Sequence, residues 1–515
     1  MKTMHKILAT AGIGLTMVAM TGCSADFLDR EPTGHLTPGA IENSQWNANL
    51  MLGLSSATTR TLFVPGSTGG SQDDDFGQKA YDIITDMYSG DNAMARNSYG
   101  WFYADLIMQS GVSTGSHASQ LWNYNYNMIY QANGLLTTVT GGDLWTEPED
   151  YENKFYYAVA RTMRAYSYFN LVTLYGRSWS EAPNQKVCPL VMSQGSDGVP
   201  VPGATVTQVY DTIVADLTAA ITAYDNATSV GYSRSDVSQP EGNVARIILA
   251  EVLLQRGNEA AGDYARAKEL ALEAVNYSGC AVLPYDQVLT TGFNTVNTSN
   301  WLWGVDVTSA SSGGLASFWG MMDMFTYGYA DVGDVHGINS YLYDQIPASD
   351  ARKNWFLSPE DATTLGLGSS YAYAPWNKFY DGDRELGGDR TWVNDLCFMR
   401  QEEGVLAAAE AAVRSNDLAT ARQMLKLLLD QRDPAKSAQV DQMDQTQLLD
   451  ELFYEWRVEM WGEGRSLNTM KRFKRSIQRS AVSYYLPSVV VNYDDDRLYF
   501  ATPQSVLQNN PDMRQ

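Results

Sequence analysis

Hydrophobic residues recur at helical spacing in two stretches of the chain, residues 263–274 and 417–428, which align with each other without a gap. In both stretches the apolar side chains share one face of a helix, and polar residues lie between them. These side chains are Tyr264, Ala267, Leu270, Ala271 and Ala274 in the first stretch, and Leu418, Ala421, Met424, Leu425 and Leu428 in the second. The pattern predicts two amphipathic helices that belong to an internal repeat.

A further helical pattern precedes each of these stretches, over residues 244–256 and 395–414. Short turns that contain Gly, or Asn and Asp, separate the two members of each pair. Each pair is therefore predicted to be a helix–turn–helix unit. Such units resemble the tetratricopeptide pattern, in which neighbouring pairs stack and bury a shared core.

Other amphipathic segments extend this helical scaffold. Residues 121–136 and 151–175 form another pair, and residues 206–221 follow a capping threonine, either Thr205 or Thr207. They indicate that helices continue through the first half of the chain.

A last helical segment spans about residues 447–473, where Gly462 and Gly464 predict an interruption. The expected fold is mainly α, with few short strands and long inserted loops. About four tetratricopeptide-like pairs are distributed over residues 121–175, 205–275 and 395–430.

The pattern changes between residues 280 and 395, where Gly, Asp, Asn, Tyr and Trp dominate and helical periodicity is weak. Loops on a rigid scaffold are where binding residues usually lie, so this is the expected ligand region. Trp301 and Trp303 alternate as in a strand, and we expect at least one of them to face the core. No linker divides the chain, so residues 41–515 are predicted to form one domain.

The N-terminus has the pattern of an export signal. Lys2 and Lys6 precede an apolar stretch over residues 7–20 that is too short to span a membrane stably. Thr21, Gly22 and Cys23 then resemble a bacterial lipobox. We therefore predict a lipoprotein signal over residues 1–22, a lipidated Cys23 and a tether over 23–40, which would hold the protein at a membrane without a spanning helix.

The net charge of −23 and the pI near 4.5 disfavour binding to nucleic acid, because the excess of carboxylates repels phosphates.

Besides Cys23, the chain contains Cys188, Cys280 and Cys397, which lack metal-ligand spacing. A buried structural thiol is expected at Cys397 in a helical context, and a disulfide between Cys188 and Cys280 stays open.

Several segments, in order along nearly the whole mature chain, resemble the SusD/RagB family. They are residues 23–32, 164–176, 242–257, 398–421, and the charged signature 455–465 with Lys471-Arg472-Phe473. Trp456 stands where the family often has Arg, and Thr469 stands where Asp is usual. These departures put local salt bridges in doubt and leave the resemblance intact.

The resemblance implies a lid that sits over a TonB-dependent transporter of the SusC type and hands oligosaccharides to it. It also implies a place on the outer face of the outer membrane, a role without catalysis and no cofactor. An oligopeptide-capturing, RagB-like role is the alternative within the family. A surface glycoside hydrolase is the alternative from another class, and it would need two carboxylates roughly 5 to 9.5 Å apart in a cleft.

An oligosaccharide site needs flat aromatic faces for stacking and polar side chains that reach hydroxyl groups. Residues 91–103 and 300–329 supply both, and the family's glycan site tends to lie in comparable stretches. The expected ligand-binding residues are Trp101, Tyr99, Trp319 and Tyr329 for stacking, and Asp91, Asn97 and Arg96 as polar partners.

Three acidic groups need separate interpretations. The carboxylates within residues 455–465 alternate with Arg457 and Arg465 at helix-neighbour spacings, so we expect structural ion pairs there and no active site. Residues 73–75, and residues 381–389 with their three aspartates, offer oxygen ligands to a structural calcium ion. Neither follows an EF-hand pattern, so solvated turns are the expectation and no metal site is predicted.

Overall fold

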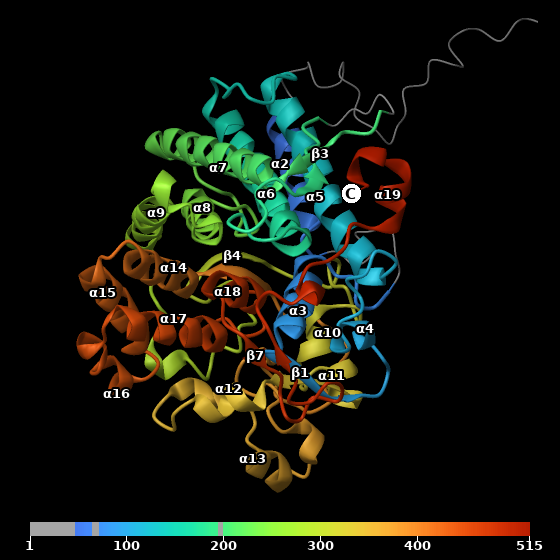
Figure 1. The fold of residues 1–515 in the computed structure, drawn as a ribbon, viewed down its shortest axis with the longest axis vertical. Coiled ribbons are helices and arrows are strands. Elements are labelled where there is room, and N and C mark those ends of the chain that lie inside the picture. The colour runs from blue at the N-terminus through green and yellow to red at the C-terminus, as the bar shows by residue number, and fades with distance from the viewer. Residues whose placement is uncertain (1–46, 64–71, 194–198, 515) are drawn as a thin grey trace, which may run out of the picture. The chain divides into compact units, whose positions relative to one another are not determined.

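Helices dominate the computed structural model, which describes residues 47–63, 72–193 and 199–514 (Figure 1). The predicted signal, Cys23 and the tether lie outside the described residues. Asn49–Gln515 form one compact unit. In the described ranges we find no helix that combines the length and the apolar character needed to cross a bilayer.

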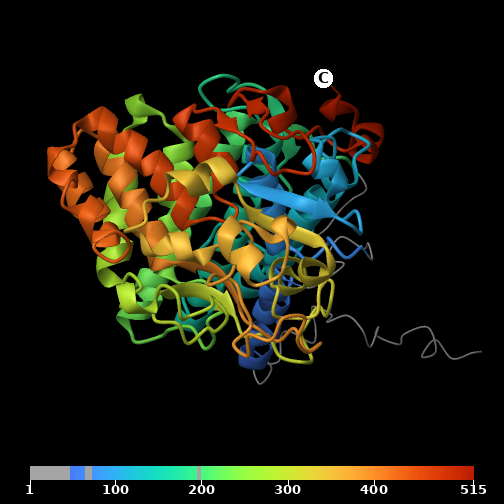
Figure 2. The same cartoon turned by 90° about the horizontal axis from the view of Figure 1, so that it is seen from below.

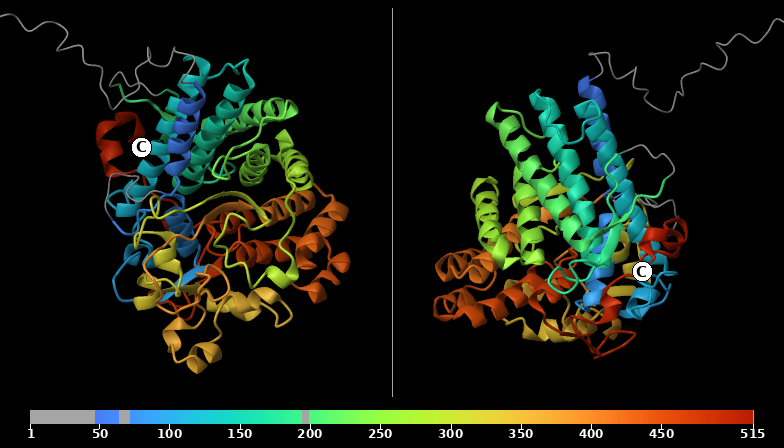
Figure 3. Two further views of the ribbon diagram at one scale, coloured as in Figure 1. Left: turned by 180° about the vertical axis from the view of Figure 1, so that it is seen from behind. Right: turned by 45° about the horizontal axis from the view of Figure 1, so that its top comes forward.

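The long helices pack largely in chain order, so that each contacts the next. α6 packs against α5 and α7, α8 against α7 and α9, and α14 against α9, α15 and α17. Figure 3 shows α5, α6 and α7 side by side, in teal to green. The bounds are α5 (Ser116–Thr140), α6 (Tyr151–Tyr175), α7 (Val206–Ser229), α8 (Gly242–Arg256), α9 (Asp263–Tyr277), α14 (Gln401–Arg414), α15 (Leu418–Leu429), α17 (Gln445–Glu459) and α18 (Ser466–Phe473).

The stacked helix–turn–helix arrangement confirms the fold class predicted from the sequence. Ala267 and Ala421, one turn into the repeated helices α9 and α15, are fully buried. Thr205 caps α7 through a reciprocal bond pair with Gln208, and Asp417 caps α15. The C-terminal helix is interrupted as predicted, between α17 and α18.

One predicted helix starts too early. Residues 395–400 were expected to be helical, but Leu396–Arg400 form strand β6, which pairs antiparallel with β4 (Trp301–Val305). All five residues of β6 are buried, and a short apolar run has no periodicity that separates strand from helix. Cys397 is therefore a buried strand thiol. Trp301 and Trp303 of β4 both face the interior.

Within the described residues, every sheet consists of two strands. In the pair that matters for the site, β1 (Asn92–Asn97) runs antiparallel to β5 (Asp334–Ile338), with a bulge between Met94 and Arg96. Figure 2 shows β1 as a blue arrow. The other pairs are β2 (Lys186–Pro189) with β3 (Gly203–Thr205), and β7 (Ile477–Gln478) with β8 (Val490–Val491).

The remaining α-helices connect these elements, and four of them, α10 to α13, lie between residues 280 and 395. They are α2 (Asn47–Arg60), α3 (Gln78–Ser89), α4 (Tyr103–Leu106), α10 (Phe318–Met322), α11 (Tyr329–Val332), α12 (Ser340–Gln345), α13 (Pro359–Thr364), α16 (Pro434–Ser437) and α19 (Gln504–Asn509). The 3₁₀ turn η4 (Ala351–Trp355) follows α12.

Charged side chains of the C-terminal signature are buried in an ion-pair network. Arg400 contacts Glu459 at 2.6 Å and Glu463 at 2.8 Å, and Arg352 contacts Glu455 at 2.7 Å. Burial alone would raise the pKa of Glu463, but Arg400 and other cations lower it to about 2. The predicted structural role of these carboxylates is confirmed.

A second buried charge cluster joins α6 to α7. Asp216 of α7 is fully buried and accepts hydrogen bonds from Arg161 at 2.7 Å and from Arg164 at 2.7 and 2.8 Å, both on α6. One carboxylate therefore bridges two guanidinium groups in the most extensive helix contact of the scaffold.

Candidate functional site

The pairing of β1 with β5 brings together two loops that lie far apart in the sequence. Asn97, at the end of β1, is opposite Asp334, at the start of β5. Tyr99 and Trp101 follow β1, and Tyr329 opens α11 immediately before β5. Three of the predicted stacking residues are therefore neighbours; we call Tyr99, Trp101 and Tyr329 the aromatic platform.

The rings of the aromatic platform contact one another edge to face. The ring centroid of Tyr329 lies 5.3 Å from that of Tyr99 and 5.7 Å from that of Trp101. Tyr99 is 58% exposed, whereas Trp101 and Tyr329 are half-buried. Aromatic surface is thus presented to solvent by rings that hold each other in place.

Carboxylates fix the aromatic platform from beneath. Buried Asp334 accepts the backbone N–H of Tyr99 at 2.8 Å and that of Trp101 at 3.3 Å. The hydroxyl of Tyr329 donates to Asp73. Burial, and then the contact with Asp73, raise the pKa of Tyr329 to about 12, so its hydroxyl stays protonated at neutral pH.

The predicted polar residues Arg96 and Asn97 lie at the edge of the aromatic platform. Asn97 donates from Nδ2 to the carbonyl of Trp101 at 3.0 Å, and exposed Arg96 donates from Nε to Ser98 Oγ at 2.8 Å. Gly333 has φ +134°, and a Cβ there would lie 2.6 Å from Ser98 Oγ. A glycine is therefore required where the two loops meet.

Trp319 does not belong to this surface, which corrects the sequence prediction. Its side chain is 2% exposed, so neither ring face is available for stacking. Ser317 caps the short helix α10 by accepting the N–H of Gly320 at 3.3 Å. The turn of α10 buries Phe318 and Trp319, which contact each other edge to face at 5.7 Å.

Asp91 is likewise misassigned as a polar partner for a ligand. It is fully buried at the start of β1, and Arg457 donates to it at 2.6 Å from Nη2 and at 2.9 Å from Nε. Its carboxylate is thus part of the structural ion pairing that the sequence predicted for Arg457. The other predicted pair member, Arg465, contacts Glu403 at 2.6 Å.

Sequence reasoning missed a second group of exposed aromatic side chains beside β1. Tyr485 lies 5.1 Å from Tyr103 and 4.7 Å from Tyr484, centroid to centroid, and the N–H of Tyr484 donates to the carbonyl of Met94. Tyr103 and Tyr484 are 46% and 55% exposed. The adjacent tyrosines Tyr484 and Tyr485 were a signal in the sequence, but their contact with β1 is long-range.

The acidic groups considered for calcium have other partners. Asp74 and Asp105 flank His117 at 3.0 and 2.7 Å; burial lowers the pKa of His117, but these carboxylates raise it to about 10. Asp381 accepts the N–H of Asp383 at 3.0 Å, as in a turn. No three His, Cys, Asp or Glu side chains gather as a metal-ligand group in the part of the chain that the structure describes.

The three cysteines that the structure describes form no disulfide. Cys188, Cys280 and Cys397 are all free, so the bond left open between Cys188 and Cys280 is not formed. Burial raises the pKa of Cys188 to about 12, which keeps that thiol protonated. Burial also raises the pKa of Cys280 and Cys397, so none of these three thiols is activated as a thiolate.

Comparison with known proteins gives two adjoining family matches. A model described as "starch-binding associating with outer membrane" matches residues 68–249, and the model of the SusD family matches residues 247–515. Among curated proteins none matches.

Several solved structures share the fold. A SusD-like carbohydrate-binding protein from Bacteroides vulgatus is 18% identical, with 90% of this chain and 96% of that chain covered and a TM-score of 0.71. A SusD superfamily protein from Bacteroides thetaiotaomicron is 19% identical, with 90% and 98% covered and a TM-score of 0.71. Surface glycan-binding protein A from Bacteroides thetaiotaomicron, in complex with laminarihexaose, is 15% identical, with 90% and 98% covered and a TM-score of 0.64.

Proposed function

The chain belongs to the SusD family, and from that premise we propose that it captures oligosaccharides at the cell surface and delivers them to a SusC-like, TonB-dependent outer-membrane transporter. The observation that carries the proposal is the aromatic platform, in which Tyr99, Trp101 and Tyr329 present ring surface to solvent. The solved relative that holds laminarihexaose supports the choice of a glycan as ligand.

The chemistry of the aromatic platform suits a pyranose chain. Ring faces stack on the C–H surfaces of sugars. The phenol of Tyr99 can donate to or accept from sugar hydroxyl groups, and that of Tyr329, which donates to Asp73, can accept from them. Arg96 and Asn97 add polar groups at the edge. Because Asp334 and the Tyr329–Asp73 contact fix the loops beforehand, little ordering is left for the binding step.

Binding without catalysis is favoured by how the nearby carboxylates are used. Both oxygens of Asp334 accept backbone N–H groups, and Asp73 accepts the hydroxyl of Tyr329. A glycoside hydrolase needs one carboxyl group as an acid and another as a base or nucleophile. These two aspartates are instead engaged in holding the aromatic platform.

Lipidation of Cys23 and an outward position on the outer membrane complete the proposal. The family description that mentions association with the outer membrane supports this location. Protease treatment of intact cells should digest the protein, whereas full protection would place it in the periplasm. Cys23→Ser should release it from the membrane fraction, and purification of the wild type from membranes should recover a TonB-dependent barrel.

The deciding experiment is native affinity electrophoresis of the full chain in mild detergent, with plant, host and microbial polysaccharides in the gel. We expect at least one polymer to retard the protein. Trp101→Ala should remove the retardation, and Tyr329→Phe should weaken it because only the hydroxyl is lost. The matched control is Tyr277→Ala, which removes a tyrosine that is 79% exposed at the end of α9.

The possible outcomes separate the functions. Retardation lost in Trp101→Ala but kept in Tyr277→Ala supports glycan capture by the aromatic platform. Binding of peptides with no binding of any polysaccharide would replace it with oligopeptide capture. Sustained release of reducing ends from a polysaccharide, abolished by one Asp or Glu substitution, would show that the protein is a hydrolase.

A further inference from the structure

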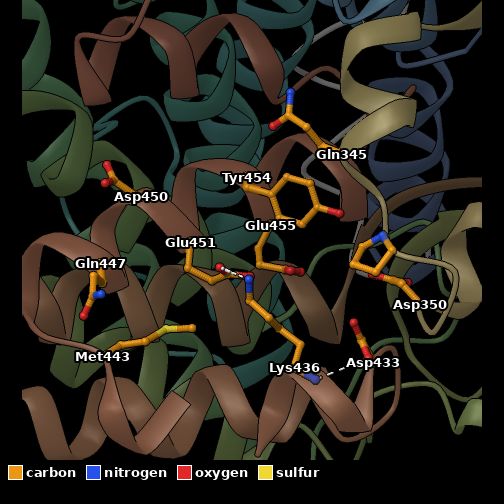
Figure 4. A pocket seen from close by; sticks show the side chains of 11 residues that line it. Gln345, Asp350, Asp433, Lys436, Met443, Gln447, Asp450, Glu451, Tyr454 and Glu455 are labelled. Carbon is orange, nitrogen blue, oxygen red and sulfur yellow. Dashed lines mark hydrogen bonds and ion pairs between the residues drawn. The ribbon is translucent and has the colours of Figure 1, made fainter. Parts of the chain in front are cut away.

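A separate acidic cavity lies between α12, α16 and α17, on elements that do not contribute to the aromatic platform. Its volume is about 460 Å³. Figure 4 shows the paired side chains of Glu451 and Lys436 near the centre of the view, with Tyr454 and Glu455 beside them. They are Gln345, Pro347, Asp350, Asp433, Lys436, Met443, Gln447, Asp450, Glu451, Tyr454 and Glu455. A volume in the range of roughly 300–1,000 Å³ is typical of sites for small molecules.

Negative charge predominates in the acidic cavity, because its lining holds five carboxylates and the single amine of Lys436. Asp350 and Glu455 share Arg352, which approaches from the core. Burial raises the pKa of Glu455 to about 7, although Arg352 opposes this. A cation that entered would meet a favourable potential.

Two polar atoms of the lining lack a hydrogen-bond partner among the described residues. They are Glu451 Oε1 and the hydroxyl oxygen of Tyr454. Glu451 is only 9% exposed, and its other oxygen, Oε2, contacts Lys436 at 2.7 Å. A buried carboxylate oxygen without a donor is costly, so Oε1 calls for a donor from a bound group.

The geometry points to a binding site for a small polar molecule that carries a primary ammonium group. An ammonium group has three N–H donors, which match Glu451 Oε1, the Tyr454 oxygen and a further carboxylate. Pro347 and Met443 supply apolar surface for the carbon body of the ligand. Two sources share this chemistry, an amino sugar and an aliphatic amine.

A metal ion or an anion fits the acidic cavity less well. Among the described residues no three His, Cys, Asp or Glu side chains converge as a metal-ligand group. An anion would be repelled by the carboxylates and attracted only by Lys436, which already pairs with Glu451.

The test is calorimetric titration of the full chain with two amines and their uncharged counterparts. Glucosamine is compared with N-acetylglucosamine, and 1,5-diaminopentane with 1,5-pentanediol. We expect at least one amine to bind and its counterpart to bind at least tenfold more weakly. The amine that binds more tightly identifies the source, sugar or aliphatic.

Variants place the binding in the acidic cavity. Glu451→Gln should weaken amine binding at least tenfold, and Tyr454→Phe several-fold. Tyr454→Phe removes an atom that has no partner, so its melting temperature should not fall below that of the wild type, and it remains informative if Glu451→Gln fails to fold. Glu269→Gln, at an exposed carboxylate of α9, is the control for nonspecific attraction by a chain of net charge −23.

Three results would overturn the proposal. The first is that neither amine binds more tightly than its uncharged counterpart. The second is that Glu451→Gln and Tyr454→Phe leave the affinity unchanged. The third is that Glu269→Gln weakens binding as much as Glu451→Gln does, because the amines would then bind by overall charge. None of these results bears on glycan capture, which is tested on other residues.

Discussion

Removal of the Asp334 carboxylate should loosen the loop that carries Tyr99 and Trp101, and the effect can be measured without any ligand. In the wild type each oxygen of Asp334 accepts one backbone N–H, from Tyr99 at 2.8 Å and from Trp101 at 3.3 Å. Asp334→Ala removes both acceptors. Asp334→Asn keeps one carbonyl oxygen, so at most one of the two amides retains a good acceptor.

The magnitude follows from the strength of bonds to a charged acceptor, about 1.5–3 kcal/mol each. Each 1.36 kcal/mol corresponds to a factor of ten in an equilibrium. Amide hydrogen exchange at Tyr99 and Trp101 should therefore be faster in Asp334→Ala by roughly 10- to 150-fold. Asp334→Asn should give an intermediate rate, because its neutral oxygen is the weaker acceptor.

The assay is hydrogen–deuterium exchange with mass spectrometry on peptides that cover residues 97–103. Peptides from α6 report whether the whole fold has opened, and Asp389→Asn is the matched control because Asp389 accepts the N–H of Thr391 in another loop. Exchange in Asp334→Ala within twofold of the wild type would refute the role of Asp334. So would equal acceleration in α6, because the change would then be global.

Three further predictions concern stability. His117 has a folded pKa of about 10 against an ordinary 6.5, so its stabilising effect is complete below pH 6.5 and is lost as the pH rises toward 10. The difference in melting temperature between the wild type and His117→Gln should therefore shrink over this interval. A difference that stays constant would contradict the prediction. Asp216→Ala should lower the free energy of unfolding by about 3–5 kcal/mol, because two buried guanidinium groups lose their carboxylate; a loss no larger than that of exposed Glu269→Gln argues against this. Trp319→Ala should cost about 3–5 kcal/mol in a melting experiment, whereas half-buried Trp101→Ala should cost less than about 1 kcal/mol; equal losses would be inconsistent with the burial of Trp319.

The helical scaffold could be predicted because its signals are local. Apolar spacing in α9 and α15, the capping Thr205 and the glycines after α17 each act within a few residues of the structure they determine. The exception, β6, shows the limit of this rule. Five buried residues become a strand because β4 offers a partner about a hundred residues earlier, and no local pattern records that pairing.

The candidate site could be predicted only in part, because residue type does not reveal burial. Trp101 and Trp319 both lie in regions of the sequence without helical periodicity. One remains half-exposed on a loop, and the other is buried by a single helical turn capped by Ser317. Tyr99 and Tyr329 meet because β1 pairs with β5, a long-range contact that composition does not encode.

Asp91, although it does not face a ligand, has a role in the position of the aromatic platform. Its carboxylate binds Arg457, and its carbonyl accepts the indole N–H of Trp461 at 2.9 Å. The start of β1 is therefore attached to α17 and the residues that follow it, while the other end of β1 leads into Tyr99. The charged C-terminal signature thus does more than neutralise buried charge. It fixes the strand from which the aromatic platform extends, so the structural ion pairs and the exposed aromatic platform depend on the same segment of the chain.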